Sequence, residues 1–229
     1  ADLSDYFYIW LRRSLKKSFP SIFSTMLVPK TQELVANPFK FEGGRKEAKK
    51  FFEDGLRNVF SSIHKNSSRD FPMTVYYAFK QEESNTETGE QATASTGWET
   101  MLEGLLTSGF SLTGTWPVRT ERKGRMRDIG SNALASSIVL VCRPRPKNAP
   151  ITTRREFVNA LRRELPTALR EMQTGNIAPV DLAQASIGPG MAVYSRYSKV
   201  LEADGSPLTV RTALQIINQE LDAYLAEQE

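Results

Sequence analysis

The spacing of hydrophobic positions divides the chain into helical and extended segments. In residues 2–18, Phe7, Trp10, Leu11 and Leu15 recur at the helical period, and Pro20 follows the segment. The same period predicts helices at about 46–65, from about 96 to 108, and at 209–226. Each segment has one apolar face, which is typical of a helix that packs against a core.

Three runs rich in β-branched and aromatic residues predict strands at 72–80, 110–117 and 135–143. The third run is apolar at nearly every position, which indicates a strand buried on both faces. A helix between the first two strands indicates a parallel crossover, so we expect 72–80 to lie parallel to 110–117. The third strand is expected to return antiparallel to the second. This order predicts an α/β fold whose mostly parallel sheet ends in an antiparallel strand.

A proline-rich basic stretch, RPRPKNAP, predicts a stiff boundary near residue 150. It divides the chain into residues 1–149 and a mainly helical region at 150–229. The sequence TRRE at Thr153–Glu156 predicts a capping box that opens a helix, and Pro166 is expected to kink or split it. A short helix is expected within 175–191. The glycines of EGGRKE and IGPG follow no apolar strand, so we interpret them as loop and turn.

Composition excludes several classes of protein. No apolar run approaches about 20 residues and no secretion signal is visible, so we expect no membrane partner. The single Cys142 lies in an apolar run and is expected to be a buried thiol. One Cys and one His argue against an internal zinc site and a disulfide framework, so no metal is expected. A reducing, cytoplasmic setting fits this cysteine usage.

The charge is unevenly distributed. The chain carries a formal net charge of +4, but residues 112–170 contain 13 Arg or Lys and 4 Asp or Glu, a difference of +9. The remainder therefore carries −5. A local excess of this size favours a polyanionic partner.

The longer stretches of the chain resemble one family. The resemblance is carried by ADLSDYFYIWLRRSL, TVYYAFKQ, TASTGWETMLEGLL, TGTWPVRTE, NALASSIVLVCRPR, GNIAPVDLAQASIGPGMAVYSRYSKVLEADGSP and TVRTALQIINQ. Together they are similar to the C-terminal half of prokaryotic adenine-specific DNA methylases that carry an N-terminal domain of unknown function. Some members contain a zinc ribbon and are encoded near anti-phage defence genes. The resemblance covers essentially all of the chain.

The resemblance implies a catalytic arrangement that is only partly present. In this family the stretch similar to ADLSDYFYIW follows an Asp-Pro-Pro-Tyr motif, and a glycine-containing loop further upstream holds S-adenosylmethionine. This chain contains neither feature. We therefore expect the rear half of a Rossmann-like methyltransferase domain at 1–149 and a helical appendage at 150–229. S-adenosylmethionine is expected in the full-length protein but not in this chain alone, which is expected to be inactive.

The resemblance also implies a pocket for a target adenine that is rotated out of the double helix. The candidate pocket residues follow the ends of strands 72–80 and 110–117: Phe79, Lys80, Trp116, Pro117 and Asn132. Structural alternatives stay open for each of them. Phe79 and Trp116 also suit a core, Lys80 a solvated surface, and Asn132 a turn.

Two further groups of residues are candidates. Near the missing motif lie Asp2, Ser4 and Asp5, which also suit helix capping. The candidates for contact with DNA phosphates are Arg119, Arg122, Lys123, Arg125, Arg127, Arg154, Arg155, Arg162 and Arg163. On the helix that follows Thr153, two arginine pairs recur eight residues apart, which equally suits a solvated face.

Two functions from different classes remain at this point. The first is the C-terminal part of a DNA adenine methyltransferase, whose partners are double-stranded DNA, the missing N-terminal part and defence-system proteins. The alternative is a non-catalytic DNA-binding or assembly module of a defence or restriction-modification system. An Asp-Pro-Pro-Tyr motif closely preceding Ala1 would favour the first.

Overall fold

The computed structural model describes residues 4–30, 33–77, 96–119, 136–174 and 186–227. The chain divides into two compact units, residues 1–55 and 56–229, and the division falls within helix α2 (Gly44–Asn66). No helix in these ranges is long and apolar enough to cross a membrane.

The first unit contains α1 (Ser4–Leu15), a 3₁₀ turn η1 (Pro38–Lys40) and the beginning of α2. Tyr8 is buried against Phe23, and its hydroxyl shares a hydrogen bond of 2.9 Å with Thr25 Oγ1. The predicted apolar face of α1 is not buried: Phe7 and Trp10 are 59% and 56% exposed. The periodicity located the helix, but only Tyr8 of α1 is buried.

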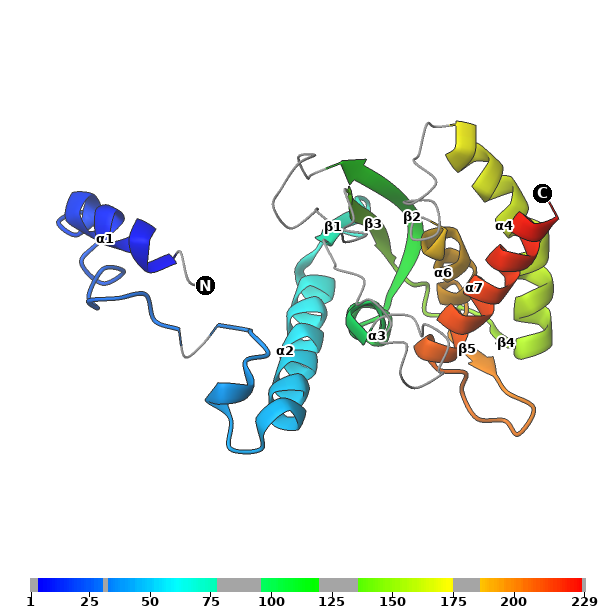
Figure 1. Cartoon of the computed structure of the whole chain (residues 1–229), viewed down its shortest axis with the longest axis horizontal. Helices are drawn as coiled ribbons and strands as arrows, with labels where there is room; N and C mark the ends of the chain where they lie inside the picture. The colour runs from blue at the N-terminus through cyan, green and yellow to red at the C-terminus, as the bar shows by residue number, and fades with distance from the viewer. Residues whose placement is uncertain (1–3, 31–32, 78–95, 120–135, 175–185, 228–229) are drawn as a thin grey trace. The chain divides into compact units, whose positions relative to one another are not determined.

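The second unit is built on a three-stranded sheet. Its strands are β1 (Met73–Tyr77), β2 (Phe110–Arg119) and β3 (Ser136–Pro144), and their order is β1-β3-β2 (Figure 1). The predicted antiparallel pairing of the second and third strands is confirmed. The first and second strands run in the same direction, as predicted, but they are not neighbours, because β3 lies between them and is antiparallel to both. The described sheet is therefore antiparallel in both of its pairings rather than mostly parallel.

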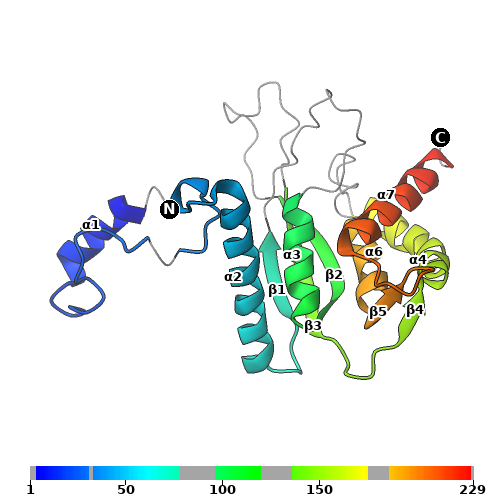
Figure 2. The ribbon, with the colours of Figure 1, turned by 90° about the horizontal axis from the view of Figure 1, so that it is seen from below.

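Helix α3 (Thr96–Thr107) connects β1 to β2 and packs on the sheet. Trp98 is buried against Tyr77 with ring centroids 5.4 Å apart, and Leu102 and Leu105 are fully buried. Gly109 has φ +92°, so this position favours glycine and ends the helix before β2, as predicted. Figure 2 shows α3 in front of the sheet, with its axis running along the strands.

The C-terminal region is mainly helical, with α4 (Arg154–Thr174), α6 (Ile187–Ser195) and α7 (Val210–Ala226). A small parallel sheet pairs β4 (Ile151–Thr153) with β5 (Lys199–Leu201). The predicted capping box is confirmed: the Glu156 carboxylate accepts the Thr153 N–H at 3.1 Å, and Thr153 Oγ1 accepts the Glu156 N–H at 3.3 Å. Pro166 does not split α4, which continues through it.

One hydrophobic core includes residues from both sides of position 150. Leu140 of β3, Phe157 of α4, Met191 of α6 and Leu214 of α7 are all fully buried in it. The expected boundary near residue 150 therefore does not separate two cores. Cys142 is a buried thiol of this core, as predicted, and its burial raises its pKa to about 12.

Candidate functional site: a cavity between β2, α4 and α6

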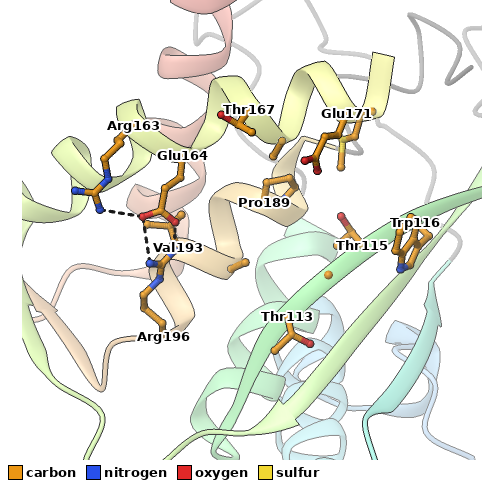
Figure 3. A pocket seen from close by; sticks show the side chains of 14 residues that line it. Thr113, Thr115, Trp116, Arg163, Glu164, Thr167, Glu171, Pro189, Val193 and Arg196 are labelled. Carbon is orange, nitrogen blue, oxygen red and sulfur yellow. Dashed lines mark hydrogen bonds and ion pairs between the residues drawn. The ribbon is translucent and has the colours of Figure 1, made fainter. Parts of the chain in front are cut away.

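A cavity of about 770 Å³ lies beside β2, where helices α4 and α6 face it (Figure 3). Its volume is within the usual range of small-molecule sites. The lining residues are Thr113, Gly114, Thr115 and Trp116 from β2; Arg163, Glu164, Thr167, Ala168, Glu171 and Met172 from α4; and Pro189, Ala192, Val193 and Arg196 from α6 and its C-terminal end.

A β-bulge in β2 determines how Trp116 is oriented. The pairing with β3 shifts between Leu112 and Gly114, so Thr113 is the extra residue. Leu112 before the bulge is buried, and after the bulge Thr115 is buried while Trp116 is 65% exposed. Without the extra residue, Trp116 would share the buried face of Leu112. The bulge therefore turns the indole away from the core.

Two glycines allow α6 to approach its neighbours closely. A Cβ at Gly188 would lie 1.8 Å from Thr115 Oγ1, and a Cβ at Gly190 would lie 2.5 Å from the Ile217 side chain. Any side chain at Gly188 would push α6 away from β2 and change the cavity. The sequence IGPG was interpreted as a turn; instead, it forms the first turn of α6.

Helix α6 is also joined to the backbone of β2. The buried hydroxyl oxygen of Ser195 accepts a hydrogen bond of 2.9 Å from the Leu112 N–H. This interaction satisfies a backbone donor at the edge of β2 beside the bulge. It fixes one wall of the cavity against another.

An ion-pair network closes one end of the cavity. Arg196 donates to both carboxylate oxygens of Glu164, at 3.2 and 2.5 Å, and Arg163 Nη2 lies 3.1 Å from the same carboxylate. The hydrogen bond from Arg196 is the largest cause that lowers the pKa of Glu164. Two guanidinium groups share one carboxylate, so this end carries one excess positive charge.

Two polar side chains of α4 line the cavity without a partner among the described residues. Thr167 and Glu171 are separated by four positions, so they lie on the same face of the helix. Figure 3 shows the Glu171 carboxylate directed toward the cavity. Neither residue was selected from the sequence, because their role depends on the docking of α4 beside β2.

Trp116 also belongs to a row of side chains across the open face of the sheet. The register places Tyr76, Val139 and Trp116 in one row. Val139 is 6% exposed, whereas Tyr76 and Trp116 are 69% and 65% exposed. Two aromatic rings thus flank a buried valine on this face.

Among the selected residues that the structure describes, Trp116 and Arg163 line the same cavity. Pro117 and Arg119 belong to β2, but their side chains lie outside the described part. The other predicted residues outside the described residues are Asp2, Phe79, Lys80, Arg122, Lys123, Arg125, Arg127 and Asn132.

The remaining predicted arginines lie on α4, and two of the three have ion-pair partners among the described residues. Arg154 pairs with Glu202 at 3.2 Å, and Arg162 makes two hydrogen bonds to Glu220 of α7, at 2.8 and 2.9 Å. Arg155 is exposed and has no ion pair among the described residues. The repeated arginine pairs thus include two contacts that join α4 to neighbouring segments.

In the first unit, Ser4 begins α1 and Asp5 lies in its first turn. Asp5 holds a later segment in place: its carboxylate pairs with Lys30 and accepts the Val28 N–H at 3.0 Å. The hydrogen bond from Lys30, followed by that from Val28, lowers the pKa of Asp5.

Comparisons of the chain with models of protein families, with curated proteins and with solved structures found no match.

Proposed function

We propose that this chain is the rear part of the catalytic domain of a DNA adenine methyltransferase. A segment that precedes it in the intact protein would hold the Asp-Pro-Pro-Tyr motif and S-adenosylmethionine. The observation that carries the proposal is the order of elements in the second unit. β1, α3 and β2 form a crossover between strands of the same direction, and β3 returns antiparallel. Such a unit suits the antiparallel end of a larger, mostly parallel sheet.

The free edge of β1 supports this proposal. β1 pairs with β3 along one edge, and no described residue pairs with its other edge. An unpaired edge exposes backbone hydrogen-bonding groups that a neighbouring strand satisfies. The parallel strands of a front half would continue the sheet from this edge.

Exposed apolar side chains also support the proposal. Tyr76 lies open on one face of the sheet and is 69% exposed. In the first unit, the apolar residues Phe7, Trp10 and Leu11 of α1 are exposed. Large apolar surfaces of this kind are usually covered by other protein. A front half of the domain would cover them.

We place the S-adenosylmethionine site in the preceding segment rather than in this chain. Gly188 and Gly190 are occupied by close contacts with Thr115 and Ile217, so they leave no room for a cofactor. We therefore assign this chain to the target side of the reaction. Trp116 would stack on the rotated adenine, and the basic segment around Arg122–Arg127 would contact phosphates.

Calorimetry tests the proposal. This chain alone is expected not to bind S-adenosylmethionine, whereas the protein that includes the preceding segment is expected to bind it with micromolar affinity. Micromolar binding by this chain alone would contradict the division of roles. An absence of binding by the longer protein would contradict the methyltransferase and favour a non-catalytic DNA-binding or assembly module.

A further inference from the structure

We propose that the cavity between β2, α4 and α6 is a nucleotide site. The base lies against Trp116 and faces Thr167 and Glu171, while the phosphate lies at Arg163 and Arg196. The inference rests on the proposed function, because the ligand is a DNA nucleotide that has left the base stack. It goes beyond that function by assigning the C-terminal helices a direct part in holding the nucleotide.

One end of the cavity suits a flat aromatic ligand. The bulge at Thr113 holds the Trp116 indole on the surface, although a large aromatic residue is ordinarily buried. An exposed aromatic ring offers a stacking surface to a base. Pro189, Ala192 and Val193 add apolar side chains to the lining of the same cavity.

The polar groups near this end select among bases. The carboxylate of Glu171 accepts hydrogen bonds but donates none, so it favours a base with an exocyclic amine and disfavours a carbonyl or a phosphate. The hydroxyl of Thr167, one turn away on the same face of α4, can donate to a ring nitrogen. Adenine and cytosine carry an amine beside such a nitrogen, whereas thymine carries a carbonyl.

The opposite end suits a phosphate. Arg163 uses one contact with Glu164, at 3.1 Å, and its remaining N–H groups have no partner among the described residues. Arg196 shares the same carboxylate, so one positive charge at this end is not neutralised. Guanidinium groups bind phosphate oxygens with strong, directed hydrogen bonds.

The separation of the two ends fits one nucleotide. Arg163 and Glu171 are eight residues apart on α4, a rise of about 12 Å. This is close to the length of an extended mononucleotide. Figure 3 shows Trp116 and Glu171 toward one end of the cavity, with Arg163 and Arg196 at the other.

Binding of deoxyadenosine monophosphate to this chain tests the site without requiring methyl transfer. Trp98 is 2% exposed, so replacing Trp10 by Phe leaves Trp116 as the exposed indole whose fluorescence reports binding. We expect saturable quenching with a dissociation constant on the order of 1 mM. Thymidine monophosphate is expected to bind about tenfold more weakly.

Substitutions separate the two ends of the site. Arg163→Gln is expected to weaken deoxyadenosine monophosphate about tenfold while leaving deoxyadenosine unchanged, because only the phosphate contact is lost. Glu171→Ala is expected to abolish the preference over thymidine monophosphate. The matched control is Arg155→Gln, an exposed arginine of the same helix outside the cavity, which is expected to leave binding unchanged.

The absence of saturable quenching at about ten times the expected dissociation constant would overturn the proposal. Equal weakening by Arg155→Gln and Arg163→Gln would also overturn it, because it would indicate general charge attraction. Nucleotide binding without methyl transfer by the intact protein would leave the site standing and contradict only the proposed function. Methyl transfer without nucleotide binding here would contradict only the site.

Discussion

Gly188 sets the distance between α6 and β2. A Cβ at this position would lie 1.8 Å from Thr115 Oγ1 and 2.4 Å from Thr115 Cβ, and β2 is fixed by its pairing with β3. The clash therefore cannot be relieved by a rotamer change alone. We expect Gly188→Ala to lower the free energy of unfolding by about 3 kcal/mol, measured by urea denaturation.

The control for this prediction is Gly104→Ala in α3. A Cβ at Gly104 would lie 3.3 Å from the ring of Phe60, a contact that a small ring movement relieves. Alanine also favours the helical backbone by about 1 kcal/mol, so we expect a change near zero or a slight gain. Equal loss of stability in both variants would contradict the proposed close packing at Gly188.

The pKa of Glu164 predicts a dependence of stability on pH. Because Arg196 and Arg163 lower the pKa of Glu164 in the folded chain, its contribution is fully present above the ordinary value of 4.5. The contribution is lost as the pH falls through the lower folded value. We expect Glu164→Gln to be less stable than the parent at neutral pH, and the difference to shrink as the pH falls below 4.5.

Thermal unfolding at several pH values measures this convergence. Glu171→Gln is the matched control, since Glu171 lies on the same helix and has no ion pair among the described residues. We expect Glu171→Gln to change the stability little, because no ion pair is lost. A constant difference for Glu164→Gln across the same range would show that the ion pairs do not stabilise the fold.

The exposure of the Trp116 side chain could not be predicted from the sequence pattern. Phe110, Leu112 and Trp116 occupy alternate positions of the predicted strand. This pattern alone does not decide whether the indole lies in the core or on the wall of a pocket. The extra residue Thr113 decides between them. Thr113 looks like an ordinary strand residue, and its exclusion from the pairing depends on the partner strand.

At the scale of elements, Ser195 joins α6 to β2. Its buried oxygen is the acceptor for the Leu112 N–H, and Ser195→Ala would leave that donor buried without this partner. We expect Ser195→Ala to lower the free energy of unfolding by about 2 kcal/mol in urea denaturation. The exposed Ser198, which donates to Pro150 O at 3.2 Å, is the control.

For Ser198→Ala we expect a change of about 0.5 kcal/mol or less, because water can replace the exposed hydrogen bond. A similar effect of both substitutions would mean that the Leu112 N–H finds another acceptor. In that case Ser195 would not hold the wall of the cavity.

The sequence predicted where helices and strands lie along the chain better than it predicted which of them are neighbours in space. Turn and capping signals such as Gly109 and the TRRE box are local, and the structure confirms both. The order β1-β3-β2 depends on which strands β3 pairs with, which no local pattern encodes. Periodicity also assigned an apolar face to α1 without showing that the face stays exposed.

At the scale of the whole molecule, the cavity forms only when segments that are distant in the sequence pack together. Its walls come from residues 113–116, 163–172 and 189–196, which meet only when the C-terminal helices share a core with the sheet. The sequence separated these segments at a boundary near residue 150, so it yielded Trp116 and Arg163 as unrelated candidates. The sequence alone could not show that Trp116, Thr167 and Glu171 line one cavity.

Methyl transfer tests the central claim most directly. The measurement is the N6-methyladenine content of duplex DNA, after incubation with S-adenosylmethionine and the intact protein in which an Asp-Pro-Pro-Tyr segment precedes Ala1. We expect methylated adenine with the parent protein and at least about tenfold less with Trp116→Ala, since loss of a stacking wall costs about 1–3 kcal/mol. An absence of methylated adenine with the folded parent protein, or normal turnover by folded Trp116→Ala, would contradict the account.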